Sequence, residues 1–241
     1  MTKQAVILAG GQGTRLGSLT MQTPKPMLPV AGRPFLEYLV WNLYQQGIQD
    51  IILSCGYLGE QIVNHFNKKR WGKLTIRGFI EPNPLGTGGA LRYLSTELES
   101  HFFLLNGDTL FDIQYLDLPL PSSSPSCVMA LRQVPNASRY GQVEMQEKRI
   151  VRFLEKAPNP HPGLINAGVC WMNRDLVAYL PEGISSIERD LFPRLATENK
   201  LFGKIYENYF IDIGIINDYD KANLDLTSIS AQIPKTFGIY G

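Results

Sequence analysis

Three cysteines and three histidines are all that this chain of 241 residues offers for metal–sulfur, disulfide or nucleophilic chemistry. Cys55, Cys127 and Cys170 lie far apart, within apolar runs, and form no CxxC pair. Their spacing excludes a zinc-ribbon or dithiol redox motif and predicts reduced, buried, structural thiols. No cysteine or histidine stands in an arrangement typical of a catalytic nucleophile and its base.

Long apolar runs and an excess of charge are also missing. No run is long enough to cross a bilayer. Met1–Gln4 leads directly into the first apolar run, so no secretory leader is expected. A formal net charge of +1 argues against nucleic-acid or membrane-surface partners. The length suits one large α/β domain, or one with a small appendage, and we expect a cytoplasmic enzyme.

What is present begins with an apolar run, Ala5–Ala9, that leads into a turn containing Gly10, Gly11, Gly13 and Arg15. The run predicts a buried parallel strand, and ligands of α/β proteins bind at the carboxyl ends of such strands. Glycines let backbone N–H groups approach an anion, and a guanidinium is a forked donor suited to phosphate. From these residues alone, a tight surface turn remains the alternative.

Two common phosphate motifs are excluded at this turn. No Lys-Ser or Lys-Thr follows the last glycine, as a P-loop requires. The dinucleotide pattern G-x-G-x-x-G also fails, because Leu16 holds the third glycine position and Gly17 comes one residue late. The turn is therefore not that of a P-loop ATPase or an NAD enzyme.

Two further stretches carry candidate ligand-binding residues. Pro24–Pro29 is predicted to be extended and rigid, so that Lys25 can be aimed at a phosphate, with a solvated lysine as the alternative. Glu81–Ala90 again has a strand end followed by a glycine turn and a helix, and its glycines would admit a ligand close to the backbone. Thr87 could cap that helix. Taken alone, the stretch favours the alternative of a plain turn and helix start.

Two aspartates follow apolar strands. Asp108 ends Asn106-Gly107-Asp108, and Asp212 lies inside the apolar run Phe210–Gly214. Carboxylates at strand ends are good Mg²⁺ ligands, and an Asx turn is the alternative for Asp108. An isolated buried aspartate is costly to desolvate, so Asp212 is expected to have a metal or a hydrogen-bonding partner.

The order of apolar and polar segments predicts a mainly parallel sheet covered by helices on both faces. Tyr140–Glu144 and Ile150–Phe153 alternate in hydropathy and predict an antiparallel pair. Ile187–Pro193 predicts a short helix that Pro193 stops.

Together these pieces resemble, in order, the sugar-1-phosphate nucleotidyltransferase family. The resemblance implies a three-layer α/β/α Rossmann-like sandwich with a mixed, mainly parallel sheet, the GT-A-like nucleotidyltransferase fold. It also implies a single domain over residues 1–241, without the C-terminal left-handed β-helix of some members. The matching pieces are Leu8–Leu16, Pro24–Pro29, Glu81–Ala90, Asn106–Asp108, Glu155-Lys156, Asn166–Gly168 and Asp212–Gly214.

The reaction that the resemblance implies joins an NTP to a sugar 1-phosphate and releases pyrophosphate, by in-line attack of the sugar phosphate on the α-phosphorus. Arg15, Lys25 and Asp108 would be catalytic, and Asp108 and Asp212 would hold Mg²⁺. Nucleotide-binding residues would be Leu8, Ala9, Gly10, Gly11, Gly13, Thr14, Arg15, Glu81, Pro84, Gly86, Thr87 and Gly107, and sugar-phosphate-binding residues Gly141, Glu155, Lys156 and Asn166.

The nucleobase and the sugar stay open at this point. Glu81 falls where related enzymes contact the base edge, and its carboxylate is a double acceptor suited to guanine N1–H and N2–H₂. GTP with a heptose 1-phosphate is favoured, and mannose 1-phosphate or a UTP-dependent reaction are the enzymatic alternatives. A non-catalytic subunit that senses an NDP-sugar is the alternative of another class. A monomer or small homo-oligomer is expected.

Overall fold

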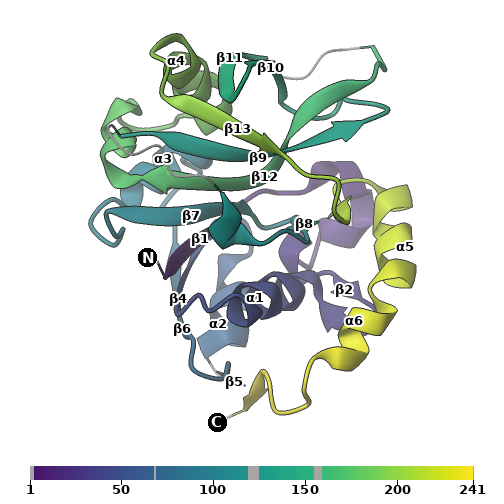
Figure 1. Ribbon diagram of the computed structural model, residues 1–241. Helices are drawn as coiled ribbons and strands as arrows, with labels where there is room; N and C mark the ends of the chain where they lie inside the picture. The colour runs from purple at the N-terminus through teal and green to yellow at the C-terminus, as the bar shows by residue number, and fades with distance from the viewer. Residues whose placement is uncertain (1–2, 68, 119–124, 155–158, 241) are drawn as a thin grey trace.

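The computed structural model describes residues 3–67, 69–118, 125–154 and 159–240. Within these residues, nine strands form one sheet through the middle of the molecule (Figure 1). From one edge to the other they are β10 (Gln142–Gln146), β11 (Arg149–Leu154), β13 (Leu201–Ile205), β9 (Cys127–Val134), β12 (Gly163–Asn173), β7 (His101–Asn106), β1 (Gln4–Ala9), β4 (Asp50–Cys55) and β6 (Thr75–Ile80).

The sheet is mixed, as expected. Strands β7, β1, β4 and β6 are parallel neighbours, and β13 runs parallel to β9. In contrast, β12 runs antiparallel to both β7 and β9. The predicted antiparallel pair is confirmed as β10 and β11, which the two residues Glu147 and Lys148 join in a tight hairpin. Parallel pairing thus predominates only in the half of the sheet that the N-terminal part of the chain forms.

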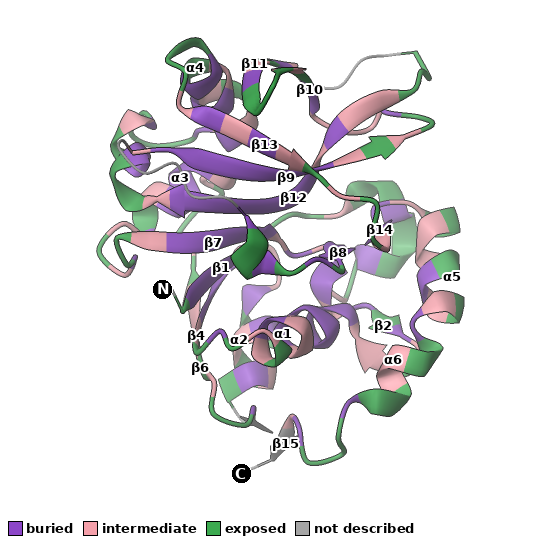
Figure 2. Cartoon of the chain, in the orientation of Figure 1, coloured by how far each residue is buried: buried purple, intermediate pink, exposed green. Residues whose placement is uncertain are grey.

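Helices cover both faces, which gives the three layers of an α/β/α sandwich. Along β1, Ala5 and Ile7 enter one core and Val6 enters the other, because successive side chains of a strand point to opposite faces. The central strands are mostly buried, whereas the outer surfaces of the helices carry the exposed residues (Figure 2). The helices are α1 (Phe35–Gln45), α2 (Gly59–Asn67) and α5 (Ile216–Asp225) against the first core, α3 (Gly86–Tyr93) and α4 (Phe192–Thr197) against the second, and α6 (Thr227–Gln232) beyond α5.

Short strands complete the fold. Phe237 lies just before the short strand at residues 239–240 and packs its ring against Trp41, Tyr44 and Trp71. The C-terminal segment thus covers the end of the first core. The paired short strands are β2 (Pro29–Val30) with β3 (Arg33–Pro34), β5 (Lys69–Arg70) with β15 (Ile239–Tyr240), and β8 (Thr109–Phe111) with β14 (Phe210–Asp212).

The expected role of Pro193 is wrong. Ile187–Leu191 forms a single π-helical turn, and α4 continues from it with Pro193 in its first turn. Proline is tolerated there because the first N–H groups of a helix have no partner inside the helix. Pro193 therefore begins a helix instead of ending one.

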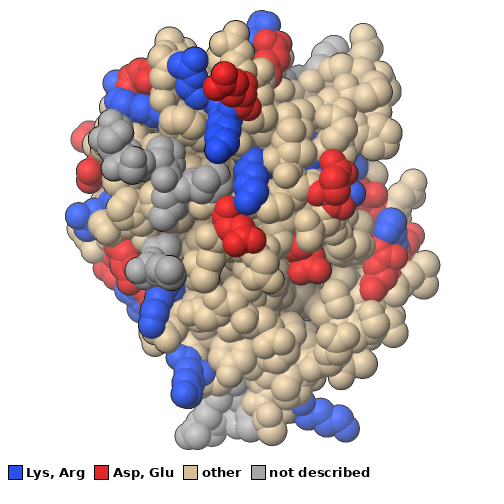
Figure 3. All heavy atoms as spheres, viewed as in Figure 1, with Lys and Arg blue, Asp and Glu red and all other residues tan. Residues whose placement is uncertain are grey.

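The surface carries charges of both signs. On the face shown in Figure 3, Lys and Arg are interspersed with Asp and Glu, in agreement with the small net charge. Among the described residues, no helix is long and apolar enough to cross a membrane.

Candidate active site

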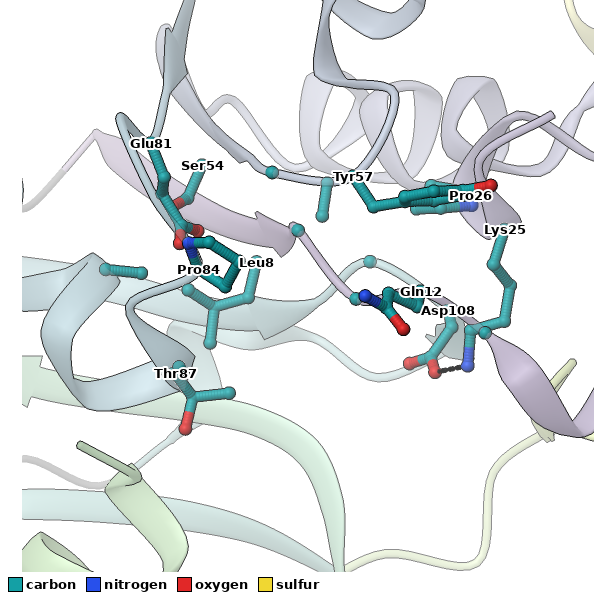
Figure 4. A pocket seen from close by; sticks show the side chains of 18 of the residues that line it. Leu8, Gln12, Lys25, Pro26, Ser54, Tyr57, Glu81, Pro84, Thr87 and Asp108 are labelled. Carbon is teal, nitrogen blue, oxygen red and sulfur yellow. Dashed lines mark hydrogen bonds and ion pairs between the residues drawn. The ribbon is translucent and has the colours of Figure 1, made fainter. Parts of the chain in front are cut away.

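A cavity of about 640 Å³ opens at the carboxyl ends of β1, β4 and β7. The chain leaves β1 toward β4 on one side, while β7 flanks β1 on the other, and such a switch point is where α/β sheets bind ligands. Figure 4 shows the cavity from close by, with Glu81 and Ser54 at one end and the Lys25–Asp108 pair at the other. The cavity is therefore elongated, with one carboxylate at its first end and an ion pair at its second.

The first glycine turn forms the wall between these ends. Gly10, Gly11 and Gly13 all line the cavity. Gly10 has no room for a side chain, since a Cβ there would lie 2.8 Å from Glu81 Oε1. Gly13 adopts a φ of 67°, which favours glycine, and its carbonyl accepts a hydrogen bond of 3.2 Å from the Thr20 hydroxyl. The turn is thus fixed from behind, and its backbone faces the cavity.

Lys25 lies in a 3₁₀ turn over Lys25–Met27, so the predicted extended course is wrong for these three residues. Pro24 is extended, and Pro26 fits the turn because its ring fixes φ near the helical value. The lysine is buried with 8% of its surface exposed, and its ammonium forms an ion pair with Asp108. The proline-flanked turn therefore holds the cation rigidly at the cavity wall.

Asp108 and Asp212 are brought together by the pairing of β8 with β14. Asp212 lies opposite Thr109 in this ladder, and Ile213 N donates a 3.0 Å hydrogen bond to the Asp108 carbonyl. The Thr109 hydroxyl lies 3.2 Å from Asp108 Oδ1 and 3.5 Å from Asp212 Oδ2. The two carboxylates, 104 positions apart in sequence, therefore share one hydroxyl neighbour.

Their electrostatics differ. Burial and the charge of Asp108 raise the pKa of Asp212 to about 6, against the opposing effects of Lys25, the Gly214 N–H and Arg15. Burial acts in the same direction on Asp108, but the Lys25 ion pair outweighs it and lowers the pKa of that carboxyl. The Lys25 ammonium thus compensates the negative charge of Asp108, whereas the negative charge of Asp212 is compensated less.

Arg15 and Thr14 do not line the cavity wall, in contrast to the other residues predicted for the nucleotide. Both lie at the start of an exposed 3₁₀ turn, Thr14–Thr20. The Arg15 guanidinium reaches Gly214 instead, where a Cβ would lie 3.0 Å from its Nη2. Arg15 is thus placed beside Asp212, at the end of the cavity that carries the aspartates.

The second glycine turn differs from the prediction in one respect. Thr87 does not cap α3, since it lies inside the helix and no side chain caps the N-terminus. Its hydroxyl donates to Glu188 Oε2 at 2.8 Å and accepts from Ile187 N at 2.9 Å. Gly89 serves packing, because a Cβ there would lie 2.3 Å from the Gly183 carbonyl oxygen. The turn therefore docks α3 onto the chain around residues 183–188.

Glu81 stands at the end of β6, beside that turn. Its Oε2 accepts a 2.9 Å hydrogen bond from Leu85 N, and burial raises the pKa of the carboxyl. The hydrogen bond fixes the side chain at the cavity wall, which Pro84, Gly86 and Thr87 also line. This end of the cavity presents an oriented carboxylate.

The residues predicted for the sugar phosphate are described in part. Gly141 and Asn166 are adjacent, since the Gly141 carbonyl accepts a 2.9 Å hydrogen bond from Asn166 N. Asn166 Oδ1 is used in a turn, where it accepts from Gly168 N at 3.0 Å. Glu155 and Lys156 lie outside the described residues.

Sequence reasoning missed several residues that line the cavity. Ser54 lies at the carboxyl end of the buried strand β4, and Gly56 and Tyr57 follow it. The rule that parallel strands present ligands at their carboxyl ends is a signal that points to them. Glu188 comes from the π-helical turn, 101 positions from its partner Thr87, and no local pattern marks it.

The donor set fits a hard divalent cation. Among the described residues, no three or more histidine, cysteine or acidic side chains are placed so that they could hold a metal ion together. A metal site made of protein ligands alone is therefore absent from them. Asp108 and Asp212 supply carboxylate oxygens from two sides of Thr109, as Mg²⁺ prefers when phosphates and waters complete its octahedron.

An α/β/α sandwich with a glycine-lined crevice at the switch point of its sheet is the architecture of a nucleotide-binding enzyme. The nucleotidyl transferase family model matches residues 4–229, and the chain belongs to this family of enzymes.

Individual relatives agree with this membership. The chain is 38% identical to a D-glycero-alpha-D-manno-heptose 1-phosphate guanylyltransferase from Aneurinibacillus thermoaerophilus, over 92% of this chain and 98% of the relative. It is 34% identical to a mannose-1-phosphate guanylyltransferase from Mycobacterium tuberculosis, over 98% of this chain and 68% of the relative. The crystal structure of HddC from Yersinia pseudotuberculosis complexed with GMP-PN superposes with a TM-score of 0.81 at 33% identity, covering 92% of this chain and 99% of that one.

Proposed function

We propose that this enzyme transfers GMP from GTP to a heptose 1-phosphate, releasing pyrophosphate and giving a GDP-sugar. One observation supports it above the others: a single elongated cavity has the oriented Glu81 carboxylate at one end and Lys25 with Asp108 at the other. The first end suits a guanine edge and the second a chain of phosphates. Relatives that are named heptose 1-phosphate guanylyltransferases support the choice of nucleotide and sugar.

Positioning and neutralisation of charge account for the chemistry of this proposal. The N–H groups of the first glycine turn hold the nucleotide, and Lys25 turns its ammonium to the α-phosphate that the sugar phosphate attacks. Arg15, beside Asp212, stabilises the leaving pyrophosphate. Mg²⁺ bound by Asp108 and Asp212 would supply Lewis-acid stabilisation of the phosphate oxygens. No protein nucleophile is required, because the attacking phosphate is already an anion.

The remaining parts of the proposal concern the sugar site and the state of the enzyme. Gly141, Asn166, Glu155 and Lys156 would face the sugar phosphate. We expect the chain to act as one domain in the cytoplasm, as a monomer or small homo-oligomer, without nucleic-acid or membrane partners.

Release of pyrophosphate, measured with Mg²⁺ across a panel of nucleoside triphosphates and sugar 1-phosphates, tests the function. We expect release with GTP and a heptose 1-phosphate, abolished by EDTA. Preference for mannose 1-phosphate would favour the activity named for the mycobacterial relative. No release with any pair would favour a non-catalytic subunit that senses an NDP-sugar.

Glu81→Gln is expected to reduce the preference for GTP over UTP about tenfold, because guanine N1–H and N2–H₂ lose a charged double acceptor. Folding should change little, since the glutamine oxygen can still accept from Leu85 N. Competition between GTP, ITP and UTP measures the effect, and ITP isolates the N2 amino group that inosine lacks. Glu60→Gln, on the exposed side of α2, is the control. An unchanged order of nucleotides would contradict the assignment of Glu81.

A further inference from the structure

A narrow recess adjoins the main cavity and shares Leu8, Asn106 and Glu188 with its wall. Its volume is about 10 Å³. A single water molecule needs about 10–15 Å³, so the recess has room for one hydroxyl group and not for a sugar ring. A ligand bound in the main cavity can therefore place one small group in the recess, beside these shared residues.

Glu188 is held so that one of its oxygens is committed and the other is not. Its Oε2 accepts hydrogen bonds of 2.8 Å from the Thr87 hydroxyl and 2.8 Å from the Ser186 hydroxyl. Within the described part of the chain, no donor forms a hydrogen bond with Oε1. Two hydroxyls from different segments thus fix the carboxylate and leave a charged acceptor for a ligand.

Asn106 supplies the complementary group. It ends β7 and borders both the cavity and the recess, with its Nδ2 at 3.0 Å from the position of a Cβ on Gly168. Over the described ranges, its side-chain amide forms no hydrogen bond. Asn166 also borders the recess, but its oxygen is occupied by Gly168 N. The recess therefore offers the open Glu188 acceptor and the NH₂ groups of Asn106 and Asn166, neither of which forms a hydrogen bond within the described ranges.

The remaining side chains that border the recess are apolar, apart from the Cys170 thiol, which is a weak donor. The apolar ones include Leu104, Ile187 and Phe192. A hydroxyl satisfies the Glu188 oxygen and the Asn106 amide at once, because it donates through its hydrogen and accepts through its oxygen. A methylene in its place would leave the Glu188 carboxylate desolvated without a partner.

We propose that this recess binds one hydroxyl group of the sugar 1-phosphate and that Glu188 is a specificity-determining residue for the sugar. The hydroxyl donates to Glu188 Oε1 and accepts from the Asn106 amide. This inference rests on the proposed function, since it takes the sugar as the ligand that reaches the recess. The carboxylate thereby selects sugars by the presence and orientation of that hydroxyl.

Glu188→Gln tests the proposal with little change of shape. The glutamine oxygen can still accept from Thr87 and Ser186, so its NH₂ turns toward the recess and replaces an acceptor with a donor. We expect kcat/KM for the sugar 1-phosphate to fall about ten- to a hundredfold, as for loss of a hydrogen bond to a charged group, with KM for GTP unchanged. Glu182→Gln, an exposed glutamate of the same segment, is the matched control.

Deoxy analogues of the sugar 1-phosphate sharpen the test. With the wild-type enzyme, one analogue should lose about ten- to a hundredfold in kcat/KM because it lacks the recess hydroxyl. With Glu188→Gln, the penalty at that position should disappear while penalties at other positions remain. Thermal unfolding of both variants, and of Glu188→Ala, shows whether the fold is retained. Equal losses for every analogue with the wild-type enzyme, or an unchanged kcat/KM for the sugar 1-phosphate in Glu188→Gln, would overturn the proposal.

Calorimetric binding of the sugar 1-phosphate separates this inference from the proposed function. If the wild-type protein binds the sugar phosphate without releasing pyrophosphate, and Glu188→Gln abolishes the binding, the recess is supported and the proposed reaction is wrong. If the wild-type protein neither reacts with nor binds any sugar 1-phosphate of the panel, both are wrong.

Discussion

Lys25→Met is expected to lower kcat about a thousandfold, the upper range for loss of one group that stabilises transition-state charge. Methionine keeps the length of the side chain and removes its ammonium. The reaction then loses the buried cation that Pro24 and Pro26 hold at the cavity wall. Pyrophosphate release at saturating GTP and sugar 1-phosphate measures the loss.

The same substitution should also destabilise the protein, because Asp108 loses the ion pair that lowers its pKa. We expect about 1–3 kcal/mol, less than for breaking a fully buried pair, since the carboxylate side chain is 22% exposed. The deficit should be present above the unfolded-state pKa of an aspartate, near 4. It should shrink as the pH falls from that value through the lowered pKa of the folded wild type, below which the carboxyl is protonated in both states. Denaturant unfolding at pH 7 and at a series of pH values below 4 measures it.

Two controls separate charge from packing at this position. Lys25→Arg retains the cation in a different shape, so it should recover part of the stability and little of the rate. Lys73→Met makes the same substitution at an exposed lysine and should leave both unchanged. Activity of Lys25→Met within tenfold of the wild type would remove Lys25 from the catalytic assignment.

Local patterns predicted the strands and turns that form the first wall of the cavity. The run Ala5–Ala9 does become a buried parallel strand, and the turn after it does line a cavity. These features succeed because they depend on neighbours in sequence. Thr87 shows the opposite case: its hydroxyl prefers a carboxylate 101 positions away to the helix end beside it, and no local pattern contains that partner.

Predicting the acidic end of the site also required knowledge of contacts between residues far apart in the sequence. That Asp108 and Asp212 would meet followed only from the family resemblance, because the ladder between β8 and β14 joins segments about 100 positions apart. Glu188 had neither a local signal nor a place among the pieces that carry the family resemblance. Its partners come from α3 and from the segment before the π-helical turn, so only the assembled fold shows that one carboxylate oxygen remains open.

Asp212→Asn should change activity and stability in opposite directions. Loss of one of the two proposed carboxylate ligands is expected to lower kcat about a hundredfold or more and to raise the Mg²⁺ concentration needed for half-maximal rate. Yet the metal-free variant should be more stable than the wild type at pH 8, because burial and the charge of Asp108 oppose ionisation of Asp212. Asparagine removes that charge and can still accept from Gly214 N.

The pH dependence gives the sign and size of this gain. In the folded, metal-free protein the pKa of Asp212 is about 6, above its ordinary value of 3.8. Between these pH values the folded state holds a proton that the unfolded state has lost, so the wild-type free energy of unfolding falls as the pH rises. This loss in the wild-type free energy of unfolding is complete above pH 6 and amounts to about 2–3 kcal/mol at most. Asp212→Asn should lack it, and unfolding of both proteins in EDTA from pH 4 to pH 8 measures the difference.

Mg²⁺ with GTP should reverse the order of stability at pH 8. A ligand that binds the folded state stabilises it by mass action, and only the wild type keeps both carboxylates for the metal. The melting temperature of the wild type should therefore rise on addition of both ligands, while that of Asp212→Asn rises less. A general disruption of the fold would lower stability under every condition. If Asp212→Asn is more stable without ligands and responds less to them, the Asp212 carboxylate destabilises the metal-free fold and contributes to binding the metal.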